Sequence, residues 1–371
     1  MQKIRILHII KSLGRGGAEM LLPETLKLHD LSRFEFHYAY FLPWKNQMVE
    51  EIEKAGGKVV CFPASNNLKL LGETSAVVKY CKKNHIDLIH CHLPWSGFLG
   101  RIVYFLTKIP VIYTEHNIQE RYHLATKWLN KLSFNSQSLA LGVSNDVTRS
   151  INENIKSKIP VQTVLNGVNT VRFQKDFEKG TGIKRKYNIP EKALVIGNIA
   201  VFRQQKSIPD WLHAFHLISQ QKPDVYAILV GAGPQEEEIK KLARELELTD
   251  RLRFAGLQTN TVDFFSSMDV FMMSSAFEGL PIALLEAMSM ECAIVSTRAG
   301  GVVEVVRDKR DGLLCEVGDY KCLAEKSLEL IGDAKMRQKM QLSARERVVS
   351  SFSLKRMVDE LEVIYSEHVK K

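Results

Sequence analysis

Short apolar runs alternate with longer, helix-like stretches along almost the whole chain. The runs are continuously apolar, as expected for strands buried on both faces of a parallel sheet. Strands that alternate with helices predict a doubly wound α/β architecture. One sheet of thirteen strands would be unusually large, so the pattern predicts two Rossmann-like domains. The predicted strands are 4–10, 34–41, 58–62, 86–91, 111–114, 139–143 and 161–165 in the first half, and 193–200, 225–230, 251–255, 270–273, 293–296 and 312–315 in the second.

A polar segment that contains two glycines, 169–186, separates the two sets of predicted strands. We therefore predict an N-terminal domain at 1–175 and a C-terminal domain at 176–350. The remaining segment, 351–371, has apolar residues at helical spacing and predicts an amphipathic helix that packs back on the N-terminal domain. Ligands of open α/β sheets bind beyond the carboxyl ends of the strands, so functional residues are expected directly after strands.

The charge of the chain is unevenly distributed. Its 371 residues include 51 Lys plus Arg and 42 Asp plus Glu, a net charge of +9. Residues 1–180 carry 24 basic and 15 acidic side chains, whereas residues 181–371 carry 27 of each. This imbalance favours an anionic partner for the first half, such as nucleic acid, an anionic membrane or a phosphorylated substrate. Charges scattered over a solvated surface are an equally good explanation.

Composition and cysteine usage predict a cytoplasmic globular protein. Apolar content of 45% and charged content of 25% exclude a disordered or collagen-like chain. The longest stretch without a formal charge, Leu132–Asn145, has 14 residues and is rich in polar side chains, so no membrane-spanning helix is expected. The first ten residues lack a signal-peptide cleavage site. The six cysteines form no Cys-x-x-Cys pair and are predicted to be buried free thiols.

Glycine-rich turns follow the first predicted strand of the chain and a strand in the second half. The dinucleotide fingerprint Gly-x-Gly-x-x-Gly is broken at 14–19 by Glu19, and the segment 231–236 departs from it in the same way. NAD binding is therefore not predicted. Gly16 and Gly17 could instead present backbone amides at a helix N-terminus to an anion. A tight turn without a ligand is the alternative.

Polar residues also follow the fourth and fifth predicted strands. His90 and His92 have the spacing of a His-x-His metal site, but no acidic partner is evident and no metal is predicted. His92, or the segment Leu93–Gly97, is expected to line the cleft instead. The segment 114–117, Thr-Glu-His-Asn, suits contacts to a hydroxylated ligand, with His116 as a candidate site residue. A hydrogen-bonded strand-end histidine is the alternative.

Two cations follow the first predicted strand of the second half. Arg203 and Lys206 suit a diphosphate, because Arg grips two oxygens at once and Lys adds a compact charge. Solvated surface positions would be an equally good explanation of this pair alone.

The most informative segment is 274–288. Pro281 is expected at the first position of a helix, so that the amides around Gly279 and Leu280 can bind phosphate. Glu278 on the preceding loop and Glu286 inside the helix could bind hydroxyl groups of two parts of one elongated ligand.

These motifs together resemble the retaining glycosyltransferases of family four, which have the GT-B fold: two Rossmann-like doubly wound domains facing a central cleft. The resemblance covers nearly the whole chain, and its most specific part is Glu278 followed after seven residues by Glu286. It implies transfer of a sugar from a UDP- or GDP-linked donor, with retention of configuration, to a glycan or lipid-linked acceptor. The expected pathway class is synthesis of cell-surface polysaccharide or glycolipid.

The resemblance also implies roles for residues. Arg203 and Lys206 would hold the diphosphate, Glu286 the ribose hydroxyls and Glu278 the donor sugar. His116 would lie near the reacting centre. Gly16 and Gly17 would approach the phosphates or the acceptor, and Gly279, Leu280 and Pro281 would also bind the donor. The family's usual Gly-Phe-Gly after the first glutamate is replaced here by Gly-Leu-Pro, and the Gly-Arg that commonly precedes its basic pair is absent before Arg203, which leaves the donor sugar open.

No metal and no cofactor are predicted, because the chain has no Asp-x-Asp motif and fixed cations can stabilise the departing diphosphate. A nucleotide-sugar epimerase of similar shape and an inactive sugar-nucleotide-binding protein are the alternatives. Nucleic acid is not a predicted partner, since no basic–aromatic motif of a known reader is visible. The basic clusters at 79–83 and 121–131, the second with Trp128 and Leu129, favour peripheral contact with the inner face of a membrane, with a solvated surface as the alternative.

Overall fold

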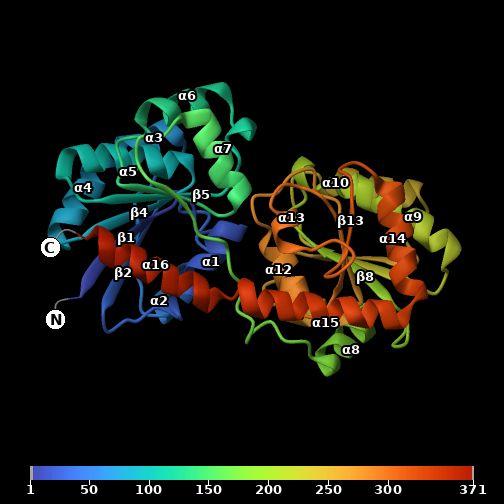
Figure 1. The fold of residues 1–371 in the computed structure, drawn as a ribbon. Coiled ribbons are helices and arrows are strands. Elements are labelled where there is room, and N and C mark those ends of the chain that lie inside the picture. The colour runs from blue at the N-terminus through green and yellow to red at the C-terminus, as the bar shows by residue number, and fades with distance from the viewer. Residues whose placement is uncertain (1–2, 370–371) are drawn as a thin grey trace. The chain divides into compact units, whose positions relative to one another are not determined.

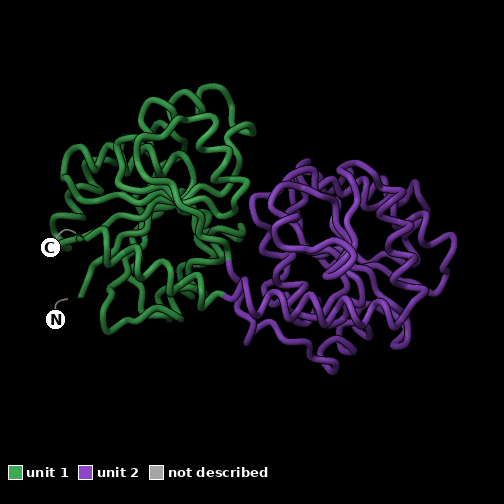
Figure 2. The backbone as a smooth tube through the Cα atoms, viewed as in Figure 1, with its two compact units in different colours: residues 1–166, 354–371 green, residues 167–353 purple. Residues whose placement is uncertain are grey.

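The computed structural model describes residues 3–369, which fall into two compact units (Figure 2). Unit 1 contains the described residues up to Asn166 together with those from Leu354 onward, and unit 2 is Gly167–Ser353. The division therefore falls before the predicted boundary at 175. The reason is that Val168 donates its N–H to the carbonyl of Phe352 (2.9 Å), which ties the start of the linker to the end of unit 2. Residues 1, 2, 370 and 371 of the predicted segments lie outside the described residues.

Within its described residues, unit 1 is built on a seven-stranded sheet with the order β3-β2-β1-β4-β5-β6-β7. Every neighbouring pair is parallel, as the continuously apolar runs predict. The strand order reverses between β1 and β4, which makes their carboxyl ends the topological switch point of this sheet. The strands are β1 Ile4–Ile9, β2 Phe34–Tyr40, β3 Lys58–Cys61, β4 Leu88–His92, β5 Val111–Glu115, β6 Leu139–Gly142 and β7 Val161–Thr163.

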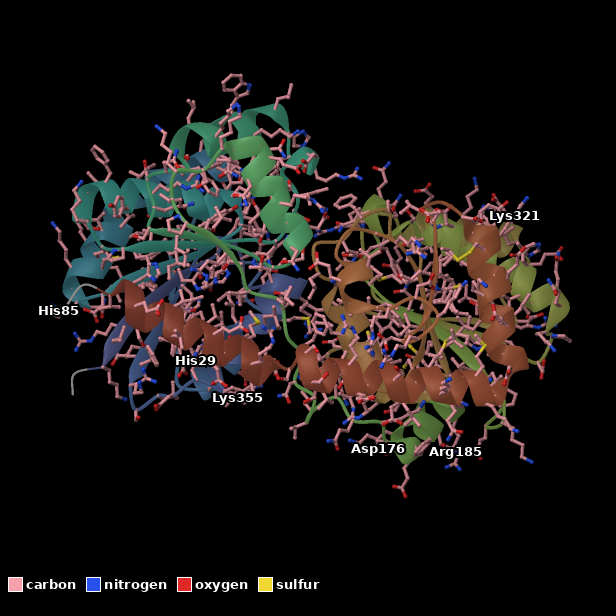
Figure 3. All side chains as sticks on the ribbon, viewed as in Figure 1. His29, His85, Asp176, Arg185, Lys321 and Lys355 are labelled. Atoms are coloured by element: carbon pink, nitrogen blue, oxygen red, sulfur yellow. A yellow bond between two sulfur atoms is a disulfide. The ribbon has the colours of Figure 1, made fainter. Side chains whose placement is uncertain are left out.

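Helices cover both faces of this sheet, and the last helix of the chain is one of them (Figure 1). Leu361, Ile364 and Tyr365 of that helix, α16, are buried in the same apolar cluster as Leu22 and Phe36. His29, labelled in Figure 3, lies 3.0 Å from the Glu362 carboxylate of α16. The helices of unit 1 are α1 Gly17–Leu26, α2 Val49–Lys54, α3 Asn67–Gly72, α4 Thr74–Lys83, α5 Pro94–Thr107, η1 Gln119–Arg121, α6 Leu124–Ser133, α7 Asn145–Ile155 and α16 Leu354–His368.

Unit 2 repeats the architecture with a six-stranded parallel sheet, in the order β10-β9-β8-β11-β12-β13 over its described residues. Its switch point lies between β8 and β11. The strands are β8 Val195–Ile199, β9 Tyr226–Val230, β10 Leu252–Gly256, β11 Val270–Met273, β12 Ala293–Thr297 and β13 Leu313–Cys315. The helices are α8 Phe177–Lys186, η2 Gln204–Lys206, α9 Ile208–Gln221, α10 Glu236–Glu245, α11 Val262–Ser267, α12 Ile282–Ser289, α13 Val302–Val305, α14 Tyr320–Gly332 and α15 Ala334–Ser351.

All thirteen predicted strands are confirmed, but the prediction that every cysteine is free is wrong. Cys315 ends β13 and Cys322 lies in the first turn of α14, so a short loop brings their Cα atoms to 5.8 Å and the two form a disulfide. Cys81, Cys91 and Cys292 are buried free thiols, and Cys61 is half-buried. Across residues 3–369, none of the helices is long and apolar enough to cross a membrane.

Candidate functional site

The switch point of unit 2 is formed by two loops that are hydrogen-bonded to each other. The first follows β8 and continues into η2, and the second follows β11 and leads into α12. The backbone N–H of Ala276 donates to the carbonyl of Gln205 (2.8 Å), and the side chain of Gln205 donates to the carbonyl of Phe277 (3.0 Å). Ser274 donates its hydroxyl to the carbonyl of Lys206 (3.0 Å). These bonds hold the residues of both loops in fixed positions.

A buried ion pair joins the two loops. Nζ of Lys206 lies 2.6 Å from Oε1 of Glu278, whose side chain is only 6% exposed. Arg203, three residues before Lys206, is exposed at the start of η2. The structure therefore brings Lys206 and Glu278 together, with a second cation on the same loop. A partly buried ammonium group of this kind interacts with an anion more strongly than a fully solvated one does.

Glycines let the neighbouring loops approach these residues closely. A Cβ atom on Gly301 would lie 1.8 Å from the carbonyl oxygen of Gly279, so no other residue fits without movement of backbone. Gly231 has a φ of +133°, and its Cβ would lie 1.9 Å from the carbonyl oxygen of Ala200. The segment 231–234 therefore serves close backbone approach.

The segment from Glu278 to Glu286 differs from its prediction at one position, Pro281. Helix α12 begins at Ile282, and Pro281 precedes it as the N-cap with φ −73° and ψ 114° instead of occupying the first helical position. Glu286 lies more than one turn inside α12, as predicted, and is 7% exposed. Leu280 is also buried. Arg203, Lys206, Glu278, Glu286 and the segment 279–281 all belong to unit 2.

The switch point of unit 1 carries histidines where unit 2 carries an ion pair. His8 on β1 is directly paired in register with His90 on β4, and His92 lies two residues further along the same face. All three are buried. The spacing of His90 and His92 was visible in the sequence, but the third ring was not, because it depends on which strands are neighbours.

Hydrogen bonds occupy four of the six ring nitrogens in this histidine cluster. Nδ1 of His8 lies 2.9 Å from Nε2 of His92. Nδ1 of His90 lies 2.8 Å from the Tyr365 hydroxyl and its Nε2 lies 2.7 Å from the Thr114 hydroxyl. Ligand atoms of the three rings lie within 4.8 Å of one another, which is a geometry that could hold a metal ion. Because the rings already bond to one another and to neighbouring hydroxyl groups, the cluster does not require one, and the absence of a metal stays a prediction.

Burial keeps these histidines neutral. It lowers the pKa of His90 to about 3 and that of His116 to about 4, and it places the pKa values of His8 and His92 well below the usual range. The Nε2 atom of His116 is buried and has no hydrogen-bond partner within residues 3–369. His116 lines a cavity of about 30 Å³ together with His8 and His92. A neutral imidazole there can donate or accept one hydrogen bond.

The segment 114–117 was predicted to contact a hydroxylated ligand, but Glu115 has a different role. It is fully buried and accepts hydrogen bonds from Tyr113 (2.7 Å), Gln119 (2.7 Å) and Tyr122 (2.5 Å). It also accepts from the backbone N–H of His116 (2.9 Å). Burial raises the pKa of Glu115, while these hydrogen bonds act against the increase. The carboxylate therefore organises the loop that carries His116.

Gly16 and Gly17 lie at the start of α1 in unit 1, as predicted. Gly16 is the N-cap, with an ordinary φ of −90°. A Cβ atom on Gly16 would lie 2.3 Å from the carboxylate of Glu19, which accepts a hydrogen bond from the Ser12 hydroxyl (2.9 Å). The contact involves the end of a flexible side chain. The turn is therefore less constrained than the glycine loops of unit 2.

Comparisons with known proteins agree with the fold. The family described as "Glycosyl transferases group 1" matches residues 181–347, and "Glycosyltransferase Family 4" matches residues 32–172. N-acetyl-alpha-D-glucosaminyl L-malate synthase of Bacillus anthracis is 29% identical, covering 80% of this chain and 78% of the relative. The capsular polysaccharide biosynthesis glycosyltransferase CapM of Staphylococcus aureus is 24% identical, covering 100% and 99%.

Solved structures share the fold across both units. Anabaena HepE in complex with UDP and glucose has a TM-score of 0.88 at 20% identity, covering 98% of this chain and 100% of HepE. A glycosyltransferase from Rickettsia africae has a TM-score of 0.84 at 21% identity, with full coverage of both chains. The two parallel sheets with interleaved helices are those of the GT-B fold. With family matches in both halves, the chain belongs to the group 1, family 4 glycosyltransferases.

Proposed function

We propose that this chain transfers a sugar from a UDP- or GDP-linked donor, with retention of configuration, to a glycan or lipid-linked acceptor of a cell-surface polysaccharide or glycolipid. The relatives support this substrate class by their names. One, 24% identical, is the UDP-Gal:alpha-D-GlcNAc-diphosphoundecaprenol alpha-1,3-galactosyltransferase of Escherichia coli. CapM acts in capsular polysaccharide biosynthesis, and HepE has been solved with UDP-glucose.

The observation that carries the proposal is the Lys206–Glu278 pair at the switch point of unit 2. Lys206 and Arg203 supply positive charge for a diphosphate, and the N-terminus of α12 adds backbone N–H groups. The Glu278 carboxylate holds Lys206 and can accept hydrogen bonds from sugar hydroxyls. Glu286, in α12, is the candidate for the ribose hydroxyls.

The chemistry that suits these groups is departure of a nucleoside diphosphate. The bond from the anomeric carbon to the phosphate oxygen breaks as a bond to the acceptor oxygen forms on the same face of the sugar. The leaving phosphate oxygen takes the acceptor proton, and its growing negative charge is stabilised by Lys206 and Arg203. His116 is assigned to the donor sugar and the reacting centre, where its neutral imidazole can act in hydrogen bonding.

We further propose that the reaction needs no metal and no cofactor, since fixed cations supply the stabilisation and the chain lacks an Asp-x-Asp motif. The expected location is the cytoplasm, with peripheral contact to the inner face of the membrane, and nucleic acid is not an expected partner. CapM and the galactosyltransferase of Escherichia coli are both named as transferases, which favours transfer over the epimerase and inactive-binder alternatives.

The decisive experiment combines binding with product analysis. Thermal shift of the full chain is measured with UDP, GDP and ADP, because a ligand that binds only the native state raises the apparent stability. The stabilising donor, labelled in its sugar, is then incubated with lipid-linked acceptors, with and without EDTA. We expect release of the nucleoside diphosphate, labelled acceptor with the donor's anomeric configuration, and no effect of EDTA. Isomerised donor without transfer would identify an epimerase, and binding without turnover an inactive binder.

A further inference from the structure

Helix α6 in unit 1 has its polar face inside and its apolar face outside. Thr126 and Asn130 are buried, whereas Leu124, Trp128 and Leu132 are 75%, 63% and 76% exposed. A surface helix of a globular protein normally shows the opposite arrangement. The exposed apolar side chains recur at four-residue spacing and therefore lie along one stripe of the helix.

A buried arginine explains why the polar face is turned inward. Arg101 of α5 is 2% exposed, and its guanidinium donates to Asn130 (2.8 Å), Ser133 (2.9 Å) and Gln137 (2.8 Å). Asn130 in turn donates to Gln119 (2.9 Å). Rotating α6 to bury its leucines would leave the Arg101 donors without acceptors, which is costly for a buried charge. The network therefore fixes the apolar stripe on the outside.

The neighbouring helix extends this exposed surface. Ile102, Phe105 and Leu106 of α5 are exposed, with Phe105 at 71%. Arg101 attaches the two helices to each other at this place. We call the set of six residues the α5–α6 apolar surface; it consists of Ile102, Phe105, Leu106, Leu124, Trp128 and Leu132. Six large apolar side chains exposed on two neighbouring helices favour a binding face.

The two helices that carry this surface contain basic residues and no acidic ones. Helix α6 contains Lys127 and Lys131 and no acidic residue, and Lys108 ends α5. Unit 1 as a whole carries 25 basic and 17 acidic side chains, a net charge of +8, whereas unit 2 carries 26 and 25, a net charge of +1. The apolar stripe is therefore flanked by lysines on the strongly basic unit.

We propose that the α5–α6 apolar surface docks on an anionic phospholipid bilayer. Apolar side chains flanked by lysines on one face are the pattern of helices that lie in the membrane interface. A second copy of this chain would present the same lysines with no acidic residues on α6 to meet them, so charge complementarity favours the lipid. The proposal rests on the peripheral membrane contact included in the proposed function and assigns it to this surface, but none of these residues belongs to the candidate site of the transfer reaction.

The test is co-sedimentation of the full chain with vesicles. We expect binding to vesicles of phosphatidylglycerol and phosphatidylcholine in equal parts, weak binding to phosphatidylcholine alone, and loss of binding in high salt. The double variant Trp128→Ser, Leu132→Ser should lower the vesicle affinity at least about tenfold. Lys127→Ala with Lys131→Ala should lower it less, and mainly at low salt. Phe177→Ser with Leu342→Ser, two exposed apolar residues of unit 2, is the matched control and should leave affinity unchanged.

Folding and nucleotide binding of each variant are checked by the thermal shift with UDP, which the surface substitutions should not alter. Equal vesicle affinity of the wild type and the Trp128, Leu132 variant would overturn the proposal. So would a wild-type dimer in solution that the same variant converts to a monomer, since the surface would then be an interface between copies. A protein that binds vesicles but no nucleotide would contradict the proposed transfer reaction and leave the membrane surface intact.

Discussion

The two switch points occupy the same place in the two sheets, yet they carry opposite chemistry. In unit 1 the residues that meet there are buried neutral histidines in contact with one another. In unit 2 they are a lysine and a glutamate 2.6 Å apart, with an exposed arginine on the same loop. The shared topology determines where side chains converge, and the side chains determine what can bind. Only the unit 2 arrangement offers charge to a diphosphate.

The same contrast extends to the interiors of the two units. Asp311 of unit 2 is fully buried and ionised, because hydrogen bonds from Arg307 (2.7 Å) and Ser343 (2.8 Å) lower its pKa against the effect of burial. In unit 1 the buried arginine, Arg101, has neutral acceptors, and burial lowers its pKa to about 10. Unit 2 therefore stabilises buried charge by ion pairs, whereas unit 1 uses neutral polar groups.

The largest effect is expected for Lys206→Ala in unit 2. It removes a phosphate-binding cation and leaves the buried Glu278 carboxylate unpaired beside the diphosphate, so kcat/KM should fall by about 10²–10³-fold. UDP affinity, measured by calorimetry, should fall as well. Lys240→Ala, which removes a more exposed lysine paired with Glu236 on α10, is the matched control.

His116→Ala in unit 1 should reduce turnover without reducing UDP affinity. Loss of UDP binding in that variant would contradict the assignment of diphosphate binding to unit 2.

Removal of the buried guanidinium in unit 1 should have the next largest effect. Arg101→Met leaves the acceptors on Asn130, Ser133 and Gln137 unpaired, and we expect a loss of about 2–4 kcal/mol in the free energy of unfolding. Hydrogen exchange in urea, followed on peptides from β4 and β5, reports this loss, with β11 and β12 as the internal reference. Arg149→Met, at an exposed position of α7, should change little. Equal stability of both variants would show that the network contributes nothing.

A matched pair of glycine substitutions compares the loops of the two units. Gly301→Ala forces a Cβ against the Gly279 carbonyl and should cost about 1–3 kcal/mol together with weaker UDP binding. Gly16→Ala meets only the flexible Glu19 side chain and should cost less than about 1 kcal/mol. Chemical denaturation and calorimetry measure both. The reverse order of effects would show that the unit 1 turn is the more constrained one.

Acidification should affect unit 1 first. Its buried histidines have folded-state pKa values below the unfolded value of about 6.5, so below that pH only the unfolded state takes up their protons. The contribution of these histidines to the free energy of unfolding should therefore be full above pH 6.5. Below that pH the free energy of unfolding should fall by about 1.4 kcal/mol per pH unit for each such histidine, until the pH reaches the folded-state pKa of about 3 for His90 and about 4 for His116. Asp311 of unit 2 has a lowered folded-state pKa, so its contribution to stability is lost only when the pH falls below the ordinary pKa of an aspartate.

Hydrogen exchange at pH 7 and pH 5.5, corrected for intrinsic rates, tests this order on peptides from β1 and β4 against peptides from β8 and β11. The variant His116→Asn should lessen the pH dependence of unit 1. Parallel loss of protection in both units would contradict the assignment of acid sensitivity to the histidines.

Local sequence patterns predicted most of the fold. Each strand is a continuous apolar run and each is found where that run lies, because burial on both faces of a parallel sheet demands such a run. The positions of Glu278 and Glu286 also follow from the local sequence. Pro281 marks the start of a helix, so Glu278 precedes the helix and Glu286 lies more than one turn inside it. The pairing of Cys315 with Cys322 was missed, because cysteine spacing alone does not reveal a loop that brings two thiols together.

Three features depended on contacts between distant segments. His8 joins His90 and His92 only because β1 lies beside β4, and strand order is not written in any single strand. Glu115 lies in the segment that was expected to meet a ligand, but Tyr113 of the same strand, together with Gln119 and Tyr122 of the segment that follows, donates hydrogen bonds to its carboxylate. Trp128 of helix α6 was expected on a surface, but the sequence did not show why, since Arg101 on another helix holds the polar face of α6 inward.

The sequence by itself therefore determined the α/β class, the thirteen strands and the residues that follow them, since these depend on local periodicity and turn chemistry. The tertiary structure decided which of those residues meet, which are saturated by hydrogen bonds, and which face of a helix is exposed. Those outcomes depend on the free energy of burying polar groups, and that is set by partners far away in the chain.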